Sequence, residues 1–338
     1  MTATVQVQPD APAEAERRRR LAPSGGADLA FRALLRTAGA VVLAIMAIVG
    51  LFLAGRAGEA VSQAGPDFVT TQNWEPDSHN FGIAAVLVGT FLIALVAISL
   101  AVPLATGMAL FISEYATGGL QRFLIGLVDL MAAVPSVVYG LWGVNWLQPN
   151  IVGLSRWLAT YCSWIPFLRV DGYDPGDPLS PQTVFTSSSF IAGVVVALMI
   201  TPIVSSIMRE VFSQAPLGER EGAYALGGTR WGMIRTVVLP FGRGGMIGGT
   251  MLGLGRAMGE TIAIYMIISP VFVIQPHLLQ NGASSISSLI ALKYGSASPF
   301  GTSALMAAGF ALFLVTLAVN FLASMVIARS RSGAQSEV

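Results

Sequence analysis

Six long apolar runs organise the chain, and each is close to the length that crosses a membrane. About 20 apolar residues in a helix cross the roughly 30 Å of hydrocarbon in a bilayer. The pattern therefore predicts an all-α integral membrane protein with six transmembrane helices, over residues 38–55, 81–113, 123–146, 190–208, 244–274 and 302–328. The second run has 33 residues without a charge, roughly 50 Å as a helix, so we expect it to tilt, to kink near Pro103 or to project past the membrane.

The polar segments between these runs divide the chain into regions. Residues 1–37 are rich in alanine, proline and charge without an apolar period, which predicts a disordered cytoplasmic tail. Its basic run, Arg17 to Arg20, is interpreted as a topology signal rather than a nucleic-acid patch, and the helix after it as an uncleaved anchor. The other predicted regions are the first helix with its outer loop over 38–80, a main membrane domain over 81–328 with an outer loop over 147–189 and a cytoplasmic loop over 209–243, and a tail over 329–338.

Composition and charge support a membrane protein and give its orientation. Hydrophobic residues make up 54% of the chain and charged residues only 11%, against about 25% in soluble domains. Of the 19 lysines and arginines, 14 fall in segments that are cytoplasmic if the N-terminus is inside, and four fall in segments outside. Positive residues favour the cytoplasmic side, so both termini are predicted to be cytoplasmic.

The chain has few residues of the kinds that build catalytic or metal centres. Cys162 is the only cysteine, so an internal disulfide is excluded, and with only His79 and His277 a histidine-rich metal centre is not expected. No nucleophile-and-base constellation of a membrane-embedded enzyme is present. The single lysine, Lys293, lies on the predicted outer side, and there is no P-loop motif. If ATP powers this protein, another polypeptide must bind the nucleotide.

The cytoplasmic loop over 209–243 has more helical character than a simple connection. Pro216 can begin a helix, apolar residues recur at helical spacing on both sides of Gly227 and Gly228, and these two glycines break the run. This pattern predicts two short amphipathic helices joined by a glycine turn. Such a pair on the membrane face could serve as a docking surface, and an ordinary connecting loop is the alternative.

Two charges stand inside the fifth apolar run, "GLGRAMGETIAIYMIIS", where Arg256 and Glu260 are four residues apart. A charge at the centre of a span costs about 2.5–3.5 kcal/mol. In a continuous helix the two side chains share a face, so they are predicted to pair, with Gly249 and Gly253 on that face for close helix packing or an open pathway. The pair is either a structural bridge that fixes packing or an anion translocation site, since a guanidinium suits phosphate or carboxylate oxygens and Glu260 could hold it until an anion competes.

Two polar positions in the third run have two interpretations each. Asp129 serves either a structural hydrogen bond or the pathway. Pro135 with Ser136 predicts a kink with a hydroxyl bonded back to the helix, and a direct substrate contact by Ser136 is the alternative.

The cytoplasmic loop contains a recognisable motif. Glu221, Gly222 and Ala223 are followed after three residues by Gly227, and after nine more by Val237, Val238, Leu239 and Pro240. This resembles the EAA motif of ABC importer permeases, with Gly222 for the usual Ala and Val237 for Ile. The resemblance implies the type I ABC importer permease fold and coupling helices that insert into a cleft on an ATP-hydrolysing subunit. It implies that the coupling residues are Glu221, Gly222, Ala223, Gly227, Leu239 and Pro240.

Three further segments narrow the resemblance. "GLGRAMGETIA", "AAVPSVVYGLWG" and "VPLATGMALFISEYA" resemble the permeases of phosphate-specific ABC importers, and among them the PstC type, over roughly residues 80–328. The resemblance implies transport of inorganic phosphate across the bacterial plasma membrane, through a pathway that includes Arg256, Glu260 and, by its place in the motif, Thr261. It implies as partners a second permease of the PstA type, an ATPase dimer of the PstB type that uses ATP and Mg, and an extracytoplasmic phosphate-binding protein. This chain itself is expected to bind no cofactor.

Other transport functions remain alternatives. An ABC permease for sulfate or molybdate fits the same physical pattern, and only the resemblance favours phosphate. An ion-coupled secondary transporter with Glu260 as its ion site is also conceivable. Such carriers often have inverted repeats and more than six helices, and the sequence shows neither.

Overall fold

The computed structural model describes residues 26–174 and 181–331. The chain divides into two compact units, residues 1–52 and 53–338. Residues 26–52 of the first unit belong to one continuous helix, α2 (Gly26–Ala64), which runs on into the second unit.

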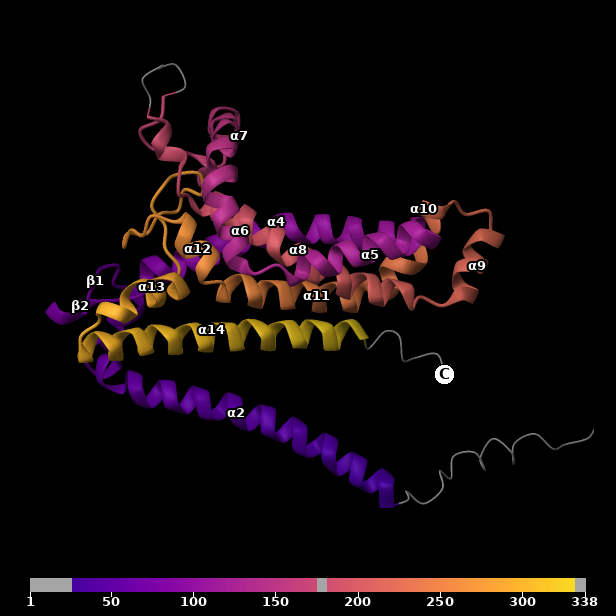
Figure 1. Cartoon of the computed structure of the whole chain (residues 1–338), viewed down its shortest axis with the longest axis horizontal. Coiled ribbons are helices and arrows are strands. Elements are labelled where there is room, and N and C mark those ends of the chain that lie inside the picture. Colours follow the sequence, from indigo (N-terminus) through magenta and orange to yellow (C-terminus); the bar gives the residue numbers. More distant parts are fainter. Residues whose placement is uncertain (1–25, 175–180, 332–338) are drawn as a thin grey trace, which may run out of the picture. The chain divides into compact units, whose positions relative to one another are not determined.

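Helices dominate the second unit (Figure 1). The helices after α2 are α3 (Asp67–Thr70), α4 (Ala84–Leu110), α5 (Gly118–Ala133), α6 (Ser136–Trp142), α7 (Gln148–Tyr161), α8 (Ser189–Ser213), α9 (Leu217–Ala225), α10 (Arg230–Met233), α11 (Leu239–Gly259), α12 (Ile262–Ile267), α13 (Ile286–Lys293) and α14 (Pro299–Arg331). Two short strands, β1 (Trp74–Glu75) and β2 (Asn80–Phe81), pair antiparallel with Trp74 opposite Phe81. Three π-helical turns extend or precede helices, at Phe111–Tyr115, Gly143–Leu147 and Ile234–Val238.

Five helices in the described residues are long and apolar enough to cross a membrane, and six spans result if the bent pair of α5 with α6 and α7 counts as one. This agrees with the six predicted runs, although several boundaries differ. The first helix begins at Gly26 rather than residue 38, so residues 26–37 are helical and not part of a disordered tail. Residues 1–25 of that predicted tail lie outside the described residues. The second span continues through Pro103 to Tyr115 by way of the first π turn.

The third run bends at Pro135, as predicted, but it forms separate helices instead of one kinked helix over 123–146. α5 ends at Ala133, Val134 is extended, and α6 begins after Pro135, with a bend of 88° between the two parts. A residue before proline is pushed away from the helical region, which explains the break. The Tyr139 hydroxyl donates to the Met131 carbonyl at 3.1 Å across the break and so fixes the bend.

The fifth run is also broken, so the predicted helix over 244–274 is wrong. α11 ends at Gly259, Glu260 is extended at φ −66° and ψ 130°, and the short helix α12 follows. Beyond Ile267 the chain is not helical until α13. The break falls between the two charges of this run.

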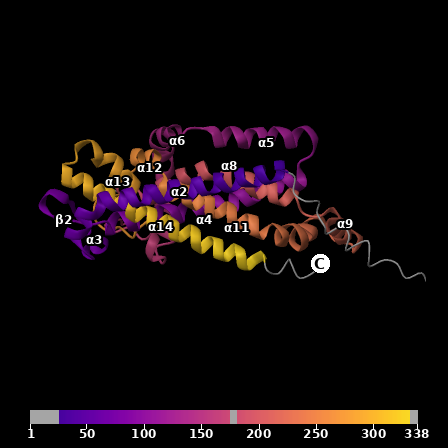
Figure 2. The ribbon, with the colours of Figure 1, turned by 90° about the horizontal axis from the view of Figure 1, so that it is seen from below.

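Helix α8 lies at the centre of the packing. Figure 2 shows α5 alongside α8, and α4 and α11 also run along it. Gly253 is buried where α11 meets α8, and a Cβ atom there would lie 2.7 Å from Cγ2 of Val204. Gly249 lies against Ile207 in the same contact. The predicted role of these two glycines in close helix packing is therefore confirmed.

Two short helices joined by a glycine turn lie within the loop predicted over 209–243, although α8 extends to Ser213 and α11 already begins at Leu239. α9 ends in a Schellman motif, because Gly228 N–H donates to the Ala223 carbonyl at 3.0 Å and Gly227 N–H donates to the Tyr224 carbonyl at 2.9 Å. Gly227 has φ 81°, which explains the glycine there. The Thr229 hydroxyl then accepts from Gly232 N–H and begins α10.

The opposite end of the unit holds the strand pair, α13 and α7 (Figure 1). The predicted outer loop over 147–189 contains a helix, because α7 occupies 14 of its residues. Residues 175–180 of this loop lie outside the described residues.

Candidate functional site: a cationic cavity and a coupling loop

A cavity of about 700 Å³ opens between α8, α11 and α14. Its wall is mostly apolar, and on α14 it covers the middle of the helix, from Gly309 to Asn320. The lining residues are Ile203, Met251, Leu252, Gly255, Arg256, Gly259, Gly309, Leu312, Phe313, Thr316 and Asn320. Arg256 is the charged residue of this wall.

Arg256 lies in the last turn of α11 and is exposed to the cavity. Its guanidinium forms no hydrogen bond or ion pair with any residue that the structure describes. A cation within an apolar span normally has a partner, because an unpaired charge there is costly. The five N–H donors of this side chain are therefore available to a ligand with several oxygens.

Glu260 does not pair with Arg256, which corrects the predicted bridge. The helix ends between the two residues, so their side chains no longer share a helical face. The Glu260 side chain is 8% exposed, and its Oε1 accepts from Ala263 N–H at 3.2 Å. Glu260 thus caps the first turn of α12.

Two polar residues of α14 face the same cavity and were missed by the sequence reasoning. The Thr316 hydroxyl donates to the carbonyls of Leu312 and Phe313, both at 2.9 Å. The Asn320 amide forms no side-chain hydrogen bond with any described residue, so it is free to bind. Asn320 is the one amide inside the apolar run over 302–328, and this could have identified it.

The other predicted pathway residues lie elsewhere. Asp129 is exposed on α5, and its carboxylate has no hydrogen-bond partner among the described residues. Ser136 begins α6 and is half-buried, and its hydroxyl does not bond back to any described part of the chain, contrary to the prediction. Thr261 follows the helix break, where its hydroxyl donates to the Gly259 carbonyl at 3.2 Å. Only Arg256 of the predicted pathway residues lines the cavity.

The motif residues of the loop over 209–243, called the coupling loop from here on, divide into two groups. Ala223 and Leu239 pack on an apolar cluster that includes Phe212, Met233 and Val238, so they hold the loop together. Glu221, Gly222, Gly227 and Pro240 are exposed.

Large apolar side chains are exposed on the same loop. Leu226 is 91% exposed and Leu217 69%, and Trp231 is also exposed. An exposed apolar group of this size on one loop indicates a surface that another molecule covers.

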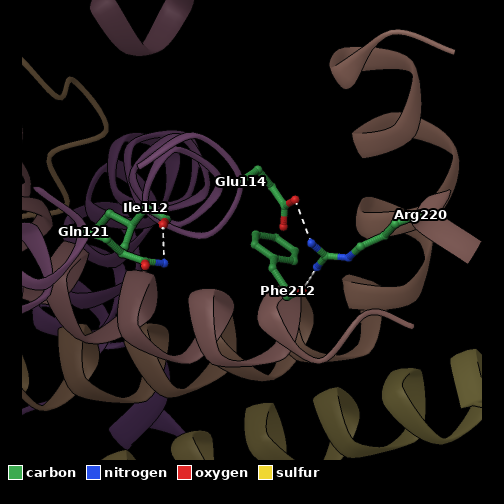
Figure 3. Close-up of polar contacts among 5 residues, drawn as sticks. All are labelled: Ile112, Glu114, Gln121, Phe212 and Arg220. Atoms are coloured by element: carbon green, nitrogen blue, oxygen red, sulfur yellow. Dashed lines mark hydrogen bonds and ion pairs between the residues drawn. The ribbon is translucent and has the colours of Figure 1, made fainter. Parts of the chain in front are cut away.

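A buried ion pair at the base of this loop was also missed. Arg220 Nη1 lies 2.9 Å from Glu114 Oε2, with 18% and 3% of the two side chains exposed (Figure 3). The residues are 106 positions apart, so no local pattern connects them.

Comparison with known proteins identifies relatives over most of the chain. The model of the family described as "Binding-protein-dependent transport system inner membrane component" matches residues 101–332. The phosphate transport system permease protein PstC of Xylella fastidiosa is 36% identical over 304 residues, which cover 90% of this chain and 91% of the relative. PstC 2 of Mycobacterium tuberculosis is 36% identical over 302 residues, covering 88% and 91% of the two chains.

Solved structures share the fold. A chain of a bacterial alginate ABC transporter, solved in complex with an alginate pentasaccharide-bound periplasmic protein, superposes with a TM-score of 0.58 at 18% identity. The match covers 92% of this chain and 96% of that chain. The predicted ABC importer permease fold is thereby confirmed.

Proposed function

The chain belongs to the family of binding-protein-dependent transport system inner membrane components, and from this premise we propose that it is the permease subunit through which an ATP-driven importer moves inorganic phosphate. It is a multi-pass protein of the bacterial inner membrane and a transport subunit rather than an enzyme. Phosphate is assigned because the relatives that match nine-tenths of the chain are phosphate permeases.

One observation carries the anion assignment: Arg256 faces the cavity without a partner in the described residues. A guanidinium that no carboxylate occupies can bind a phosphate with two parallel N–H donors. The Asn320 amide on the facing helix can donate to a third phosphate oxygen. Glu260 and Thr261 lie just past Gly259 of the cavity wall, and we assign them to the same pathway. Asp129 and Ser136 do not line this cavity and stay predictions.

We propose that a separate ATPase dimer of the PstB type drives transport with ATP and Mg. The exposed motif residues Glu221, Gly222, Gly227 and Pro240 would lie at its surface, with Ala223 and Leu239 supporting them from behind. A second permease of the PstA type and an extracytoplasmic phosphate-binding protein complete the proposed complex. This chain binds no cofactor in this scheme.

Radiolabelled phosphate uptake by the reconstituted complex tests the proposal. We expect the wild type to transport phosphate only with ATP, and Arg256→Ala to reduce uptake about 100-fold, since the lost hydrogen bonds between the guanidinium and the anion are worth up to about 3 kcal/mol. Thr250→Val is the matched control, because Thr250 is on the same helix and its hydroxyl bonds only to the Met246 carbonyl. Uptake by Arg256→Ala at the wild-type rate would remove the site assignment.

Competition decides which oxyanion is carried. Excess unlabelled phosphate should suppress uptake, while sulfate and molybdate at the same concentration should not. Preferential suppression by sulfate or molybdate would leave the assignment as an ABC permease intact, but would make that anion, and not phosphate, the transported substrate.

A further inference from the structure

The coupling loop contacts the rest of the unit at the π turn Phe111–Tyr115, which follows α4. Arg220 of α9 forms the buried ion pair with Glu114, and Arg230 of α10 lies over the Tyr115 ring at 5.2 Å from its centre. Both short helices of the loop therefore contact this one turn. Figure 3 shows Glu114 of the π turn and Arg220 of α9 reaching toward each other, with Phe212 of α8 beside the pair.

The Arg220 guanidinium joins three segments. Besides the ion pair at 2.9 Å, its Nη2 donates to the Phe212 carbonyl at 2.6 Å, in the last turns of α8. The Phe212 ring is fully buried in the apolar cluster below the loop. One side chain of α9 thus holds the ends of both α4 and α8.

α9 has little else to hold it. It has nine residues, and isolated helices of this length are marginal. Every one of them is exposed except Arg220 and Ala223. A proline precedes it and the glycine turn follows it, so its position depends on these two side chains.

The hydrogen bonding of the Glu114–Arg220 pair is incomplete, so stability alone does not explain the pair. Glu114 Oε1 and Arg220 Nε are buried without a hydrogen-bond partner among the described residues. A buried ion pair that is not fully satisfied contributes little net stability compared with apolar packing. A role in fixing position accounts for it better.

α8 leads from this pair to the cavity. Phe212 and Ile203 are nine residues apart on α8, roughly 14 Å along the helix, and Ile203 lines the cavity that Arg256 faces. A displacement of α9 that pulls on Arg220 therefore acts on the helix that forms the cavity wall.

We propose that the Glu114–Arg220 pair is a positioning link that passes movement of α9 to α4 and α8, and through α8 to the cavity at Arg256. This inference rests on the proposed function in one respect, namely that a nucleotide-driven partner displaces α9. Glu114 and Arg220 touch neither the transported anion nor, in this proposal, the ATP.

The test uses the reconstituted complex with four variants: Glu114→Gln, Arg220→Lys, Arg220→Glu and the exchanged pair Glu114→Arg with Arg220→Glu. We expect Glu114→Gln to lower phosphate uptake at least tenfold while ATP hydrolysis stays within threefold of wild type, so that more ATP is spent per phosphate. Arg220→Lys keeps the positive charge but loses the planar guanidinium with its several donors. Its phosphate uptake should fall between those of the wild type and Glu114→Gln. The exchanged pair should recover at least threefold over Arg220→Glu.

Gln121→Ala is the matched control. Gln121 Nε2 donates to the Ile112 carbonyl at 3.1 Å in the same turn, but it does not contact α9 (Figure 3). Its uptake and hydrolysis should both stay near wild type. Co-purification of the ATPase with each variant measures assembly separately.

A second readout needs no transported anion. In a Cys162→Ser background, Ile203→Cys places this chain's only thiol at the cavity wall. We expect a non-hydrolysable ATP analogue to change its labelling rate at least fivefold, and Glu114→Gln to abolish this change with the complex intact.

The outcomes separate the two proposals. Absence of ATP-dependent phosphate uptake in the wild type contradicts the proposed function, and the labelling change then still decides the link. The link is overturned if Glu114→Gln keeps both uptake and the labelling change, if uptake and hydrolysis fall only in step with lost assembly, or if the thiol does not respond to nucleotide in the wild type.

Discussion

Two arginines of this chain, Arg220 and Arg256, are placed in opposite ways. Arg220 is mostly buried, paired with Glu114 and bonded to a backbone carbonyl. Arg256 is exposed to a cavity and has no partner in the described part of the chain. The same side chain thus fixes the shape of the molecule in one region and is left available to a ligand in the other. The difference predicts that alanine at Arg220 will mainly lower stability, whereas alanine at Arg256 will mainly lower transport.

The largest loss of stability is expected for Arg220→Ala. It leaves the Glu114 carboxylate buried without a counter-charge, which costs about 3–5 kcal/mol. Denaturant or thermal unfolding of the purified complex measures this loss. Glu114→Ala with Arg220→Ala should lose less than the single change, because no buried charge remains. Equal losses in both would show that packing, not charge, sets the cost.

Arg256→Ala is expected to change the free energy of unfolding in the opposite direction. A charge within a span costs about 2.5–3.5 kcal/mol at most, so its removal should leave the free energy of unfolding unchanged or raise it by up to that amount. The same unfolding measurement checks this, beside the uptake assay in which transport is lost. A destabilised Arg256→Ala protein would mean that Arg256 has a structural partner.

A smaller effect is expected where α11 packs on α8. Gly253→Ala places a Cβ 2.7 Å from Val204 Cγ2 and should cost about 1–3 kcal/mol. Gly244→Ala on the same helix meets no atom within 4 Å and should be neutral or stabilising by up to about 1 kcal/mol. A similar cost at both positions would contradict the close contact.

The smallest expected effect on stability is at Glu260. Glu260→Ala removes the cap of α12 and should cost about 1 kcal/mol, whereas Glu260→Gln keeps an oxygen that can accept from Ala263 N–H and should cost less than about 0.5 kcal/mol. We expect Glu260→Gln still to lower uptake severalfold, because we assign the Glu260 charge to the pathway just past Gly259 of the cavity wall. Uptake at the wild-type rate in Glu260→Gln would restrict this residue to its capping role.

The sequence predicted the number of spans and the form of the coupling loop because both depend on local signals. Long apolar runs mark the spans, and Gly227 with Gly228 marks the turn whose positive φ only glycine adopts easily. The bend before α6 was visible only as Pro135. Its angle of 88° depends on packing, since a Cβ on Gly140 would lie 3.0 Å from Ala263 of α12.

The sites were predicted less well, because their geometry is not local. Arg256 was identified as a charge in an apolar run, but its pairing with Glu260 assumed a continuous helix. Gly259 was only a weak signal for the break, because α11 contains several other glycines. Glu114 and Arg220 are far apart in sequence and meet only through the packing of α4 and α8. Asn320 could be identified from the sequence only as the one amide in the apolar run over 302–328.

The break after Gly259 also explains how the chain keeps a cation without a carboxylate beside it. The last carbonyls of a helix have no amide partners within it, and together they act as about half a negative charge. Arg256 lies in that last turn of α11. The helix dipole there stabilises a cation by about 0.3–1 kcal/mol, and unlike a side-chain counter-ion it does not occupy the guanidinium. By ending α11 here, the backbone supplies a diffuse negative charge that an arriving anion does not have to displace.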